Sequence, residues 1–475
     1  MSLKKNFLYS SILTVSAYLF PLLVYPYISR VLGLSNIGIV NFVDNLINYF
    51  VLISMMGINT VGIREIAAAK VDKKGLSKTF MSLLLLTVIT TGLAIVVLFI
   101  SMYTISTLFP YRDMLYVGIV KLFFNVFLLE WFFIGLEEFK YITKRTLIIR
   151  VLYVTSIFVF IHQASDYKLY FGITVLAVVM NALVNVFYTR KFIHFTLNSV
   201  SPAPYVSTFM IMGVYALLTN VYTMLNAVWL GFVTNTDEVG YYTTATKLQI
   251  LIMGFLNSFT NIVFPRVSAL IAEGKKEEYW KKISQALDAI FMFSFPAVAF
   301  VITAGPTVLR LLVGDEFEGS YLPLRIITPL ILVIGIEQVL IVQILMARHH
   351  DRIVLFNSIV GALTMIMANF LITKTLGAPG SAIVWVLAET TILMLAIIEV
   401  SKKEGYVFPV LRLLRYCLCY APLLAILAII CNISDNEFIL LGSASILTLC
   451  YACIIEVFVT KNHVATQFYN KILKR

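Results

Sequence analysis

The feature that most constrains this chain is a succession of long apolar stretches, which recur along its whole length. Stretches of about 18 or more apolar residues are typical of membrane-spanning segments. Lipid offers the backbone no hydrogen-bonding partner, so a span must be a helix or a strand of a closed barrel, and these continuous stretches do not alternate as barrel strands do. The sequence therefore predicts an all-α polytopic membrane protein with about fourteen transmembrane helices. The predicted spans are 7–29, 38–58, 80–103, 114–136, 146–163, 169–190, 208–232, 241–264, 284–304, 322–346, 353–373, 380–400, 411–431 and 437–459.

The composition agrees with a chain that is dissolved in lipid. Of its 475 residues, 60% are hydrophobic and only 13% are charged, and the mean hydropathy is +0.92. A soluble domain carries about a quarter charged residues. The first apolar stretch follows Lys4 and Lys5 and contains Pro21 and Pro26. It is too long for a signal peptide, so we interpret it as the first permanent helix.

Lysine and arginine residues indicate how the spans are oriented. They gather in every second loop, on the side where the N-terminus lies, and few occur on the opposite side. Cytoplasmic loops of membrane proteins carry such an excess of positive charge. We therefore expect a multi-pass protein of a bacterial inner membrane with both termini in the cytoplasm. These loops also explain the formal net charge of +11, so we expect no nucleic-acid partner.

An internal repeat relates two parts of the chain. A shift of 202 residues places Gly38 on Gly240 and Arg64 on Arg266, in the same topological positions. Such parallel repeats are related by an axis along the membrane normal, and their substrate sites lie at the interface of the repeats near the middle of the membrane. The repeat predicts a central cavity and three parts, which are an N-terminal six-helix lobe at 1–200, a C-terminal six-helix lobe at 201–403, and two extra helices with a cytoplasmic tail at 404–475.

Polar residues within the spans are candidates for a binding site, since a charge at the centre of a membrane costs about 2.5–3.5 kcal/mol. Spacings of three and four residues place the candidates of each span on one helical face. In the first half they are Asn41, Asp44, Asn45 and Asn48. In the second half they are Asn220 and Asn226, which share a face with Thr219 and Thr223, and Lys247 on the next span.

These residues allow two interpretations. The asparagines line a hydrated central cavity or join helices through hydrogen bonds. Lys247 needs an anion, which is either Asp44, as a structural pair, or an anionic substrate, in which case Asp44 handles a coupling ion. Glu337 and Glu389 lie near the middle of their spans and are further candidates for ion coupling, although a structural role also accounts for them.

Other charged residues lie nearer the ends of the spans. Arg30, at the external end of the first span, lines the cavity or extends to the membrane surface. Arg64 and Arg266 end their helices on the cytoplasmic side, where a cation favours the helix dipole. Alternatively, they form an entrance that attracts phosphate. We interpret Lys121 and Glu130, within the fourth span, as structural.

Sequence motifs of enzymes and ATP-driven pumps do not occur. The chain has no G-x-x-x-x-G-K-[ST] phosphate loop, no H-E-x-x-H and no paired Cys or His ligand set. The predicted external loops are short, whereas a membrane glycosyl polymerase is expected to hold its chemistry in a large one. We therefore expect a protein that is not an enzyme and has no catalytic residues, metal or cofactor.

Two segments near the N-terminus resemble a known family. They are YPYISRVLGLSNIGIVNF at 25–42 and GINTVGIREIAAAK at 57–70, and both are similar to the opening of the Wzx-type O-antigen and capsule flippases of bacteria. Their superfamily also holds multidrug and toxin extruders (MATE) and the lipid II flippase. The resemblance implies a MATE-like fold of two lobes and alternating access. The implied substrate is a polyprenyl-diphosphate-linked oligosaccharide, moved from the cytoplasmic to the external leaflet for capsule or lipopolysaccharide synthesis.

The resemblance also implies a cationic cavity for the diphosphate, which Lys247 fits better than Arg30. Most other polar residues of the spans are Asn, Thr or acids, so a neutral or zwitterionic glycan is an alternative. Two other functions stay open, an ion-coupled small-molecule exporter, using Asp44 with Glu337 or Glu389 for protons or sodium, and a membrane glycosyl polymerase. The expected partners are the lipid-linked glycan, a coupling ion and the machinery that polymerises the polysaccharide.

Overall fold

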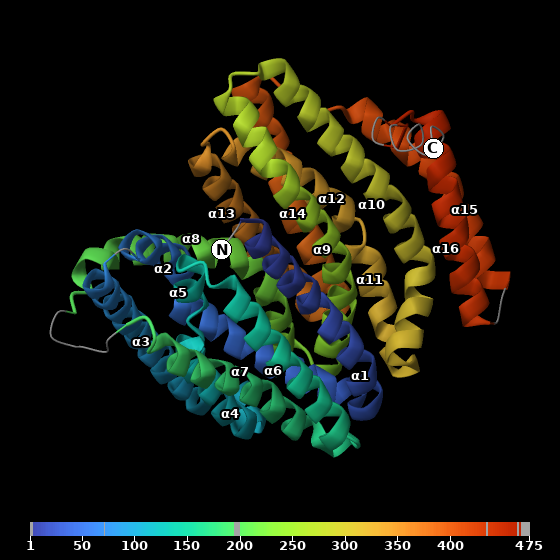
Figure 1. The fold of residues 1–475 in the computed structure, drawn as a ribbon. Coiled ribbons are helices and arrows are strands. Elements are labelled where there is room, and N and C mark those ends of the chain that lie inside the picture. The colour runs from blue at the N-terminus through green and yellow to red at the C-terminus, as the bar shows by residue number, and fades with distance from the viewer. Residues whose placement is uncertain (1–2, 71, 194–199, 434–435, 463–464, 467–475) are drawn as a thin grey trace. The chain divides into compact units, whose positions relative to one another are not determined.

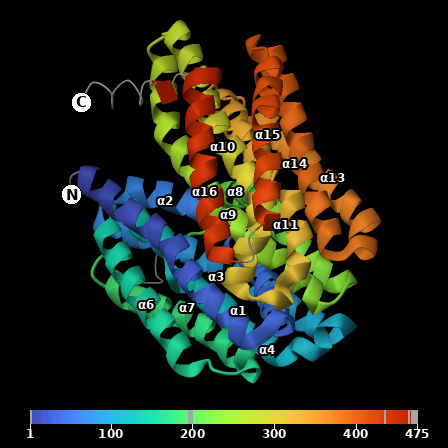
Figure 2. The same ribbon diagram turned by 90° about the vertical axis from the view of Figure 1, so that its right-hand side faces the viewer.

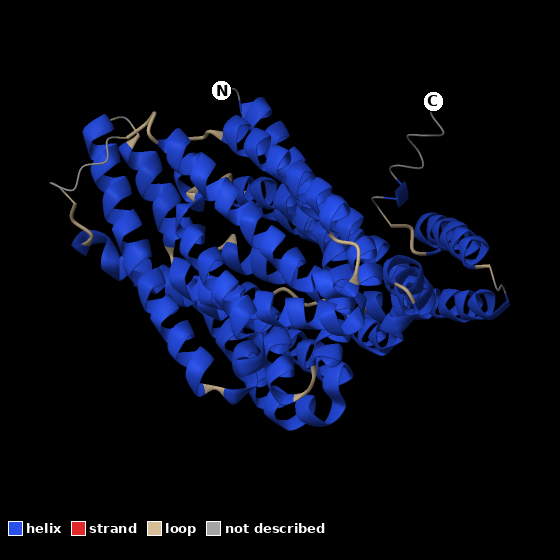
Figure 3. Cartoon of the chain, turned by 90° about the horizontal axis from the view of Figure 1, so that it is seen from below, coloured by secondary structure: helices blue, strands red, loops and turns tan. Residues whose placement is uncertain are grey.

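The chain is built from helices in the computed structural model, which describes residues 3–70, 72–193, 200–433, 436–462 and 465–466 (Figure 1). Within these ranges no strand occurs (Figure 3). The elements, in chain order, are α1 (Leu3–Met55), α2 (Ile58–Ala69), α3 (Lys73–Thr104), η1 (Ser106–Tyr111), α4 (Arg112–Asn125), η2 (Val126–Leu128), α5 (Glu130–Gly135), α6 (Phe139–Phe160), η3 (Ala164–Asp166), α7 (Tyr167–Thr189), α8 (Ala203–Val233), α9 (Thr236–Ala272), α10 (Lys276–Val313), η4 (Asp315–Ser320), α11 (Tyr321–Ile327), α12 (Leu330–Glu337), η5 (Gln338–Met346), α13 (Asp351–Ala368), η6 (Asn369–Thr373), α14 (Lys374–Glu404), α15 (Val410–Ile433), α16 (Glu437–Ile454) and η7 (Ile455–Val459).

The first two predicted spans, 7–29 and 38–58, form a single element, α1, with a kink at Gly33. Gly33 has φ 76° and ψ 169°, a conformation that glycine adopts without steric cost and other residues avoid. A second kink of this kind lies in α14, where Gly377 has φ 61° and ψ −135°. In both places the chain passes from one apolar segment to the next through a kink rather than a long loop.

Eight helical segments of the described part are long and apolar enough to cross a membrane, or nine if the bent pair Asp315–Ile327 and Leu330–Met346 is one span. Two of the eight, Ile12–Met55 and Asp351–Glu404, have 44 and 54 residues. A bilayer core requires about 20 helical residues, so each is long enough for two of the predicted spans. The protein is therefore an all-α, polytopic membrane protein.

Helix α6 differs from the predicted span 146–163 in where it begins. It starts at Phe139 and includes Lys144, Arg145 and Arg150. These cations interrupt its apolar character, and α6 is not among the eight apolar segments. The helix therefore carries charged side chains that the hydropathy pattern assigns to a preceding loop.

The chain forms two compact units, Met1–Val239 and Gly240–Arg475. In the first unit, α1 packs against α3, α4, α6, α7 and α8. The sequence repeat places the residues of α8 in the second lobe, whereas this division places them in the first unit. The lobes predicted from the sequence repeat, 1–200 and 201–403, therefore have a different boundary from the two compact units. The division into lobes stays a prediction.

The first unit has an aromatic core that includes Phe80, Trp131, Phe132 and Phe133, all almost fully buried. Helix α5 brings the Trp131 ring close to α2 at Gly62. A Cβ atom at Gly62 would lie 2.5 Å from Cε3 of Trp131, so this approach requires a residue without a side chain.

In the second unit, α10 packs against α11, α12, α15 and α16. Figure 2 shows α10 beside α15 and α16. A buried polar cluster joins the last two helices to α10. The hydroxyls of Tyr416 and Tyr420 donate hydrogen bonds to the Glu456 carboxylate at 3.0 and 2.8 Å. Asn462 donates to the Tyr416 hydroxyl at 3.0 Å and to the backbone carbonyl of Asp288, in α10, at 2.8 Å. A buried carboxylate without such donors would be costly, so the cluster fixes how these helices pack.

The helix surfaces expose many large apolar side chains. Leu93 of α3 is 63% exposed, and Leu411 and Leu418 of α15 are 84% and 76% exposed. Apolar surfaces this extensive are rare on soluble monomers. They are the faces that the protein presents to lipid.

Candidate functional site

A closed network of three polar side chains joins α1 to α4 within the first unit. Lys121 Nζ donates to Asp44 Oδ1 at 2.6 Å and to Asn48 Oδ1 at 2.8 Å. Asn48 Nδ2 donates in turn to Asp44 Oδ2 at 3.0 Å. The Lys121 side chain is 13% exposed and that of Asp44 is 34% exposed. Each partner thus neutralises a charge that would be costly alone within a span.

The other candidate asparagines do not belong to this network. Asn45 Nδ2 donates to the backbone carbonyl of Asn41 at 2.8 Å, one helical turn earlier. Asn226 of α8 is fully buried in the same unit. The side chain of Asn220 lies outside the described residues. The helical spacing therefore placed Asp44 and Asn48 on one face correctly, and it did not indicate Lys121 as their partner.

The predicted cations of the candidate site have different environments. Lys247 is half-buried on α9, and Arg30 is exposed on α1. Arg64 is exposed and forms an ion pair with the neighbouring Glu65 at 2.9 Å, and Arg266 is also exposed. Nothing in these environments tests the roles that the sequence suggests, so they stay predictions.

Glu337 and Glu389 form a pair of buried carboxyl groups in the second unit. Glu337 ends α12 and is 7% exposed, and Glu389 lies within α14 and is 4% exposed. Trp385 Nε1 donates a hydrogen bond to Glu389 Oε1 at 3.0 Å, whereas Glu337 Oε1 is buried without a hydrogen-bond partner among the described residues. Helices α12 and α14, which carry the two carboxyl groups, pack against each other. Buried carboxyl groups on packed helices are candidates for ion coupling, and that role stays a prediction.

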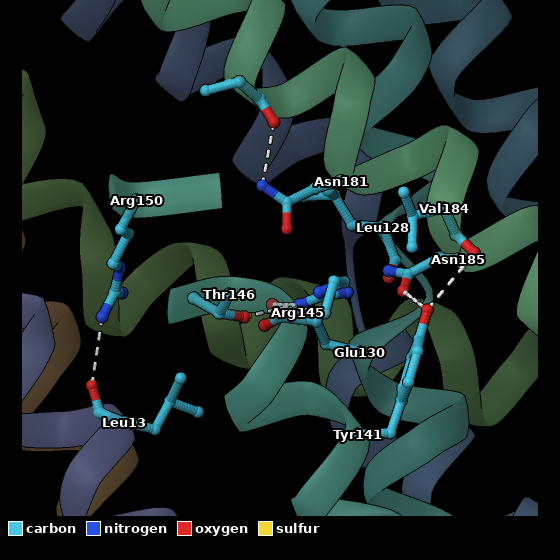
Figure 4. Close-up of polar contacts among 11 residues, drawn as sticks. Leu13, Leu128, Glu130, Tyr141, Arg145, Thr146, Arg150, Asn181, Val184 and Asn185 are labelled. Carbon is cyan, nitrogen blue, oxygen red and sulfur yellow. Dashed lines mark hydrogen bonds and ion pairs between the residues drawn. The ribbon is translucent and has the colours of Figure 1, made fainter. Parts of the chain in front are cut away.

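Sequence reasoning missed the polar cluster around Arg145. Arg145 is buried in the second turn of α6, where its Nη2 donates to Glu130 Oε1 at 3.1 Å and to Thr146 Oγ1 at 2.9 Å (Figure 4). The hydropathy pattern assigned Arg145 to a loop, and only the helix that begins at Phe139 shows that it is buried.

Asn185 of α7 belongs to the same region of the first unit. Leu129 has φ 50°, which interrupts the helix between η2 and α5 and leaves the Leu128 carbonyl without its helical partner. The side-chain amide of Asn185 donates to that carbonyl (Figure 4). Its oxygen accepts a hydrogen bond from the Tyr141 hydroxyl at 2.8 Å. The Asn185 side chain therefore supplies the missing hydrogen bond to the Leu128 carbonyl and fixes the orientation of the Tyr141 side chain.

Near Arg145, but outside the predicted spans, Lys70 and Glu137 form an ion pair. Lys70 Nζ lies 2.8 Å from Glu137 Oε1, and both side chains are largely exposed. The hydrogen bond from Lys70, followed by the attraction of its charge, lowers the pKa of Glu137. Exposed pairs contribute little to stability, so this contact orients the two side chains more than it stabilises the fold.

Among the residues that the structure describes, no three His, Cys, Asp or Glu side chains are placed to hold a metal ion.

Comparisons with known proteins identify relatives that match most of the chain. The sequence model of the family described as "Polysaccharide biosynthesis protein" matches residues 3–271. The chain is 23% identical to the "Putative O-antigen transporter" of Escherichia coli strain K12 over 419 residues, which is 85% of this chain and 98% of the relative. It is 25% identical to the "Putative O-antigen transporter" of Shigella dysenteriae over 403 residues, 82% of this chain and 98% of the relative.

Two solved structures have a similar fold. The lipid II flippase MurJ, in an inward closed conformation, matches with a TM-score of 0.76 and 14% identity, covering 99% of this chain and all of MurJ. An inward-facing multidrug transporter of the MATE family matches with a TM-score of 0.64 and 16% identity, covering 82% of this chain and 94% of that one. At these identities the likeness is one of fold.

Proposed function

This chain belongs to the polysaccharide biosynthesis protein family, and from that premise we propose that it is a flippase for lipid-linked oligosaccharides. It translocates polyprenyl-diphosphate-linked repeat units from the cytoplasmic to the external leaflet by alternating access, for cell-surface polysaccharide synthesis. The observation that carries the proposal is the likeness to proteins named as O-antigen transporters over more than four fifths of the chain. The fold shared with the lipid II flippase supports it.

The proposed location is a bacterial inner membrane with both termini in the cytoplasm. The chain is a multi-pass membrane protein, and its basic loops support this orientation. The relatives are named as transporters, which supports transport rather than catalysis. A polysaccharide polymerase and a coupling ion, a proton or sodium, are the further partners that we propose.

The contacts of Asp44 bear on the proposed binding residues. Its carboxylate is neutralised by Lys121, so it does not require Lys247 as a counter-ion. We propose that Lys247 meets an anionic group of the substrate, the diphosphate, while Asn41 and Asn45 contact the sugar. For ion coupling we propose the buried carboxyl groups of Glu337 and Glu389 rather than Asp44, because the Asp44 carboxylate is already paired with Lys121.

The first test measures which leaflet holds the lipid-linked repeat units. Cells that make the polymer, but lack this gene, are treated with a membrane-impermeant enzyme that labels sugars. The units are expected to stay unlabelled until the gene is expressed again, because only units in the external leaflet are accessible. Labelling that persists without the gene would show that another protein flips them, and would favour a small-molecule exporter.

Replacing Lys247 by alanine is expected to slow this labelling about tenfold, the effect of losing one charge-assisted contact. Lys247→Arg is the matched control and should retain most of the rate, since a diphosphate requires the charge more than the shape of the side chain. The measurement is the initial rate of labelling at equal protein level. An unchanged rate in Lys247→Ala would remove Lys247 from the binding site.

A further inference from the structure

The first unit contains a pocket of about 800 Å³ beside the first half of α6. Its polar wall is formed by Lys70, Lys140, Lys144 and Arg145, with Glu137 and Glu138, and its apolar wall includes Ile148 and Val184. It lies at the end of the unit where the basic loops gather, the side predicted to be cytoplasmic. None of the substrate residues predicted from the sequence lines it.

Arg145 is the buried cation of this pocket. Its side chain is 3% exposed, and only Nη2 has hydrogen-bond acceptors, while Nε and Nη1 have none among the described residues. A guanidinium group keeps its charge under all physiological conditions, and its planar fork of N–H donors matches the oxygens of a phosphate. Because Glu130 already pairs with the Arg145 charge, it is the two unsatisfied donors that favour a further oxygen acceptor supplied by a ligand.

The rest of the polar wall has the charge and rigidity to hold such an anion. Lys140 and Lys144 are exposed on α6, so they can reach a ligand at the pocket mouth. The rings of Tyr141 and Tyr188 stack with centroids 3.6 Å apart, and Asn185 holds the Tyr141 hydroxyl. Lys70 is paired with Glu137 and Arg145 with Glu130, so the net positive charge of the wall comes from Lys140 and Lys144, with Glu138 as the remaining carboxylate.

The apolar wall indicates what the anion is attached to. Ile148 is 61% exposed on α6 and Val184 is 41% exposed on α7. Val151 and Phe187 continue these two faces and are also exposed. Exposed apolar faces of two adjacent membrane helices lie against lipid chains, so the pocket opens beside the place where acyl chains run.

We propose that this pocket binds the headgroup of an anionic phospholipid from the surrounding leaflet. The lipid phosphate accepts hydrogen bonds from Arg145, the two exposed lysines attract its charge, and its two chains lie along the apolar faces of α6 and α7. One guanidinium and a single apolar flank fit one phosphate with two chains better than a diphosphate that carries several sugars. The site is separate from the proposed transport site and does not depend on it.

The test measures lipid binding to the purified full-length protein by native mass spectrometry in detergent. The lipids titrated are phosphatidylglycerol, phosphatidylcholine and undecaprenyl diphosphate. Phosphatidylglycerol is expected to bind about tenfold more tightly than phosphatidylcholine, whose own cation neutralises its phosphate. Arg145→Gln is expected to weaken phosphatidylglycerol binding about tenfold, the effect of one charge-assisted contact.

A second variant guards against a folding defect in Arg145→Gln. Lys140→Gln with Lys144→Gln changes only exposed side chains and should weaken phosphatidylglycerol binding about threefold to tenfold. The matched control is the double variant Lys281→Gln and Lys282→Gln. These two lysines of α10 are exposed but do not line the pocket, so phosphatidylglycerol binding should stay unchanged.

Three results would overturn the proposal. Unchanged phosphatidylglycerol binding in both pocket variants would exclude the site, and an equal loss in the α10 control would reduce it to general surface charge. Tighter, Arg145-dependent binding of undecaprenyl diphosphate would assign the pocket to the carrier lipid instead. Because binding is measured without transport, failure here leaves the flippase proposal untouched, and failure of the leaflet test leaves this one untouched.

Discussion

Replacing Lys121 by methionine is expected to lower the free energy of unfolding by about 2 kcal/mol and to reduce the yield of monodisperse protein. Methionine keeps the length of the side chain but leaves the Asp44 carboxylate charged and unpaired within a span. Breaking a fully buried pair costs about 3–5 kcal/mol, and the partial exposure of Asp44 reduces that cost. The measurement is thermal unfolding of the purified protein, followed by fluorescence in nanodiscs.

Two controls show whether the unpaired charge of the Asp44 carboxylate causes the loss of stability. Adding Asp44→Asn to Lys121→Met removes that charge and should restore most of the lost stability. Lys168→Met breaks an ion pair of similar length, 2.8 Å to Asp113, whose side chains are 53% and 76% exposed, and it should leave the unfolding temperature unchanged. If the double variant is as unstable as Lys121→Met, packing of the lysine stem, and not charge, is responsible.

Replacing Gly62 by alanine is expected to lower the free energy of unfolding by about 1–3 kcal/mol. The added Cβ atom would lie 2.5 Å from the ring of Trp131, which is itself packed against Phe80 and Phe132. Since the ring has no free space, α2 and α5 must move apart. The same thermal unfolding measurement reports the loss.

The matched control is Gly92→Ala in α3. No atom lies within 4 Å of a Cβ at Gly92, so the alanine meets no neighbour. Alanine favours a helix over glycine by about 1 kcal/mol, so this variant should be slightly more stable than the wild type. The two substitutions are thus expected to change the free energy of unfolding in opposite directions. If both lower it, the close approach of α2 and α5 is not the cause of the loss in Gly62→Ala.

Most of the fold could be predicted because apolar runs report directly on membrane spans. Each of the predicted spans coincides with a helix or a run of joined helices in the described part of the chain. The joins could not be predicted, because hydropathy does not show whether two spans are separated by a loop or by a kink such as Gly33. The start of α6 was placed too late for a related reason, since charged residues in its first two turns resemble a loop.

The candidate site could be predicted only along single helices. The spacing of Asp44 and Asn48 places them on one face, and they are hydrogen-bonded one turn apart. Their partner Lys121 lies on another helix, and no local pattern in the sequence encodes such a contact. The packing of α12, which carries Glu337, against α14, which carries Glu389, could not be predicted for the same reason.

The network of Asp44, Lys121 and Asn48 has an electrical consequence. The anion and the cation are 2.6 Å apart, so together they carry no net charge. Moving one unit charge through a potential of about 100 mV changes its free energy by about 2.3 kcal/mol, whereas moving a neutral pair changes nothing. When α1 and α4 shift together along the membrane normal, these two residues carry no gating current, and the resting voltage of the cell neither drives nor opposes their movement.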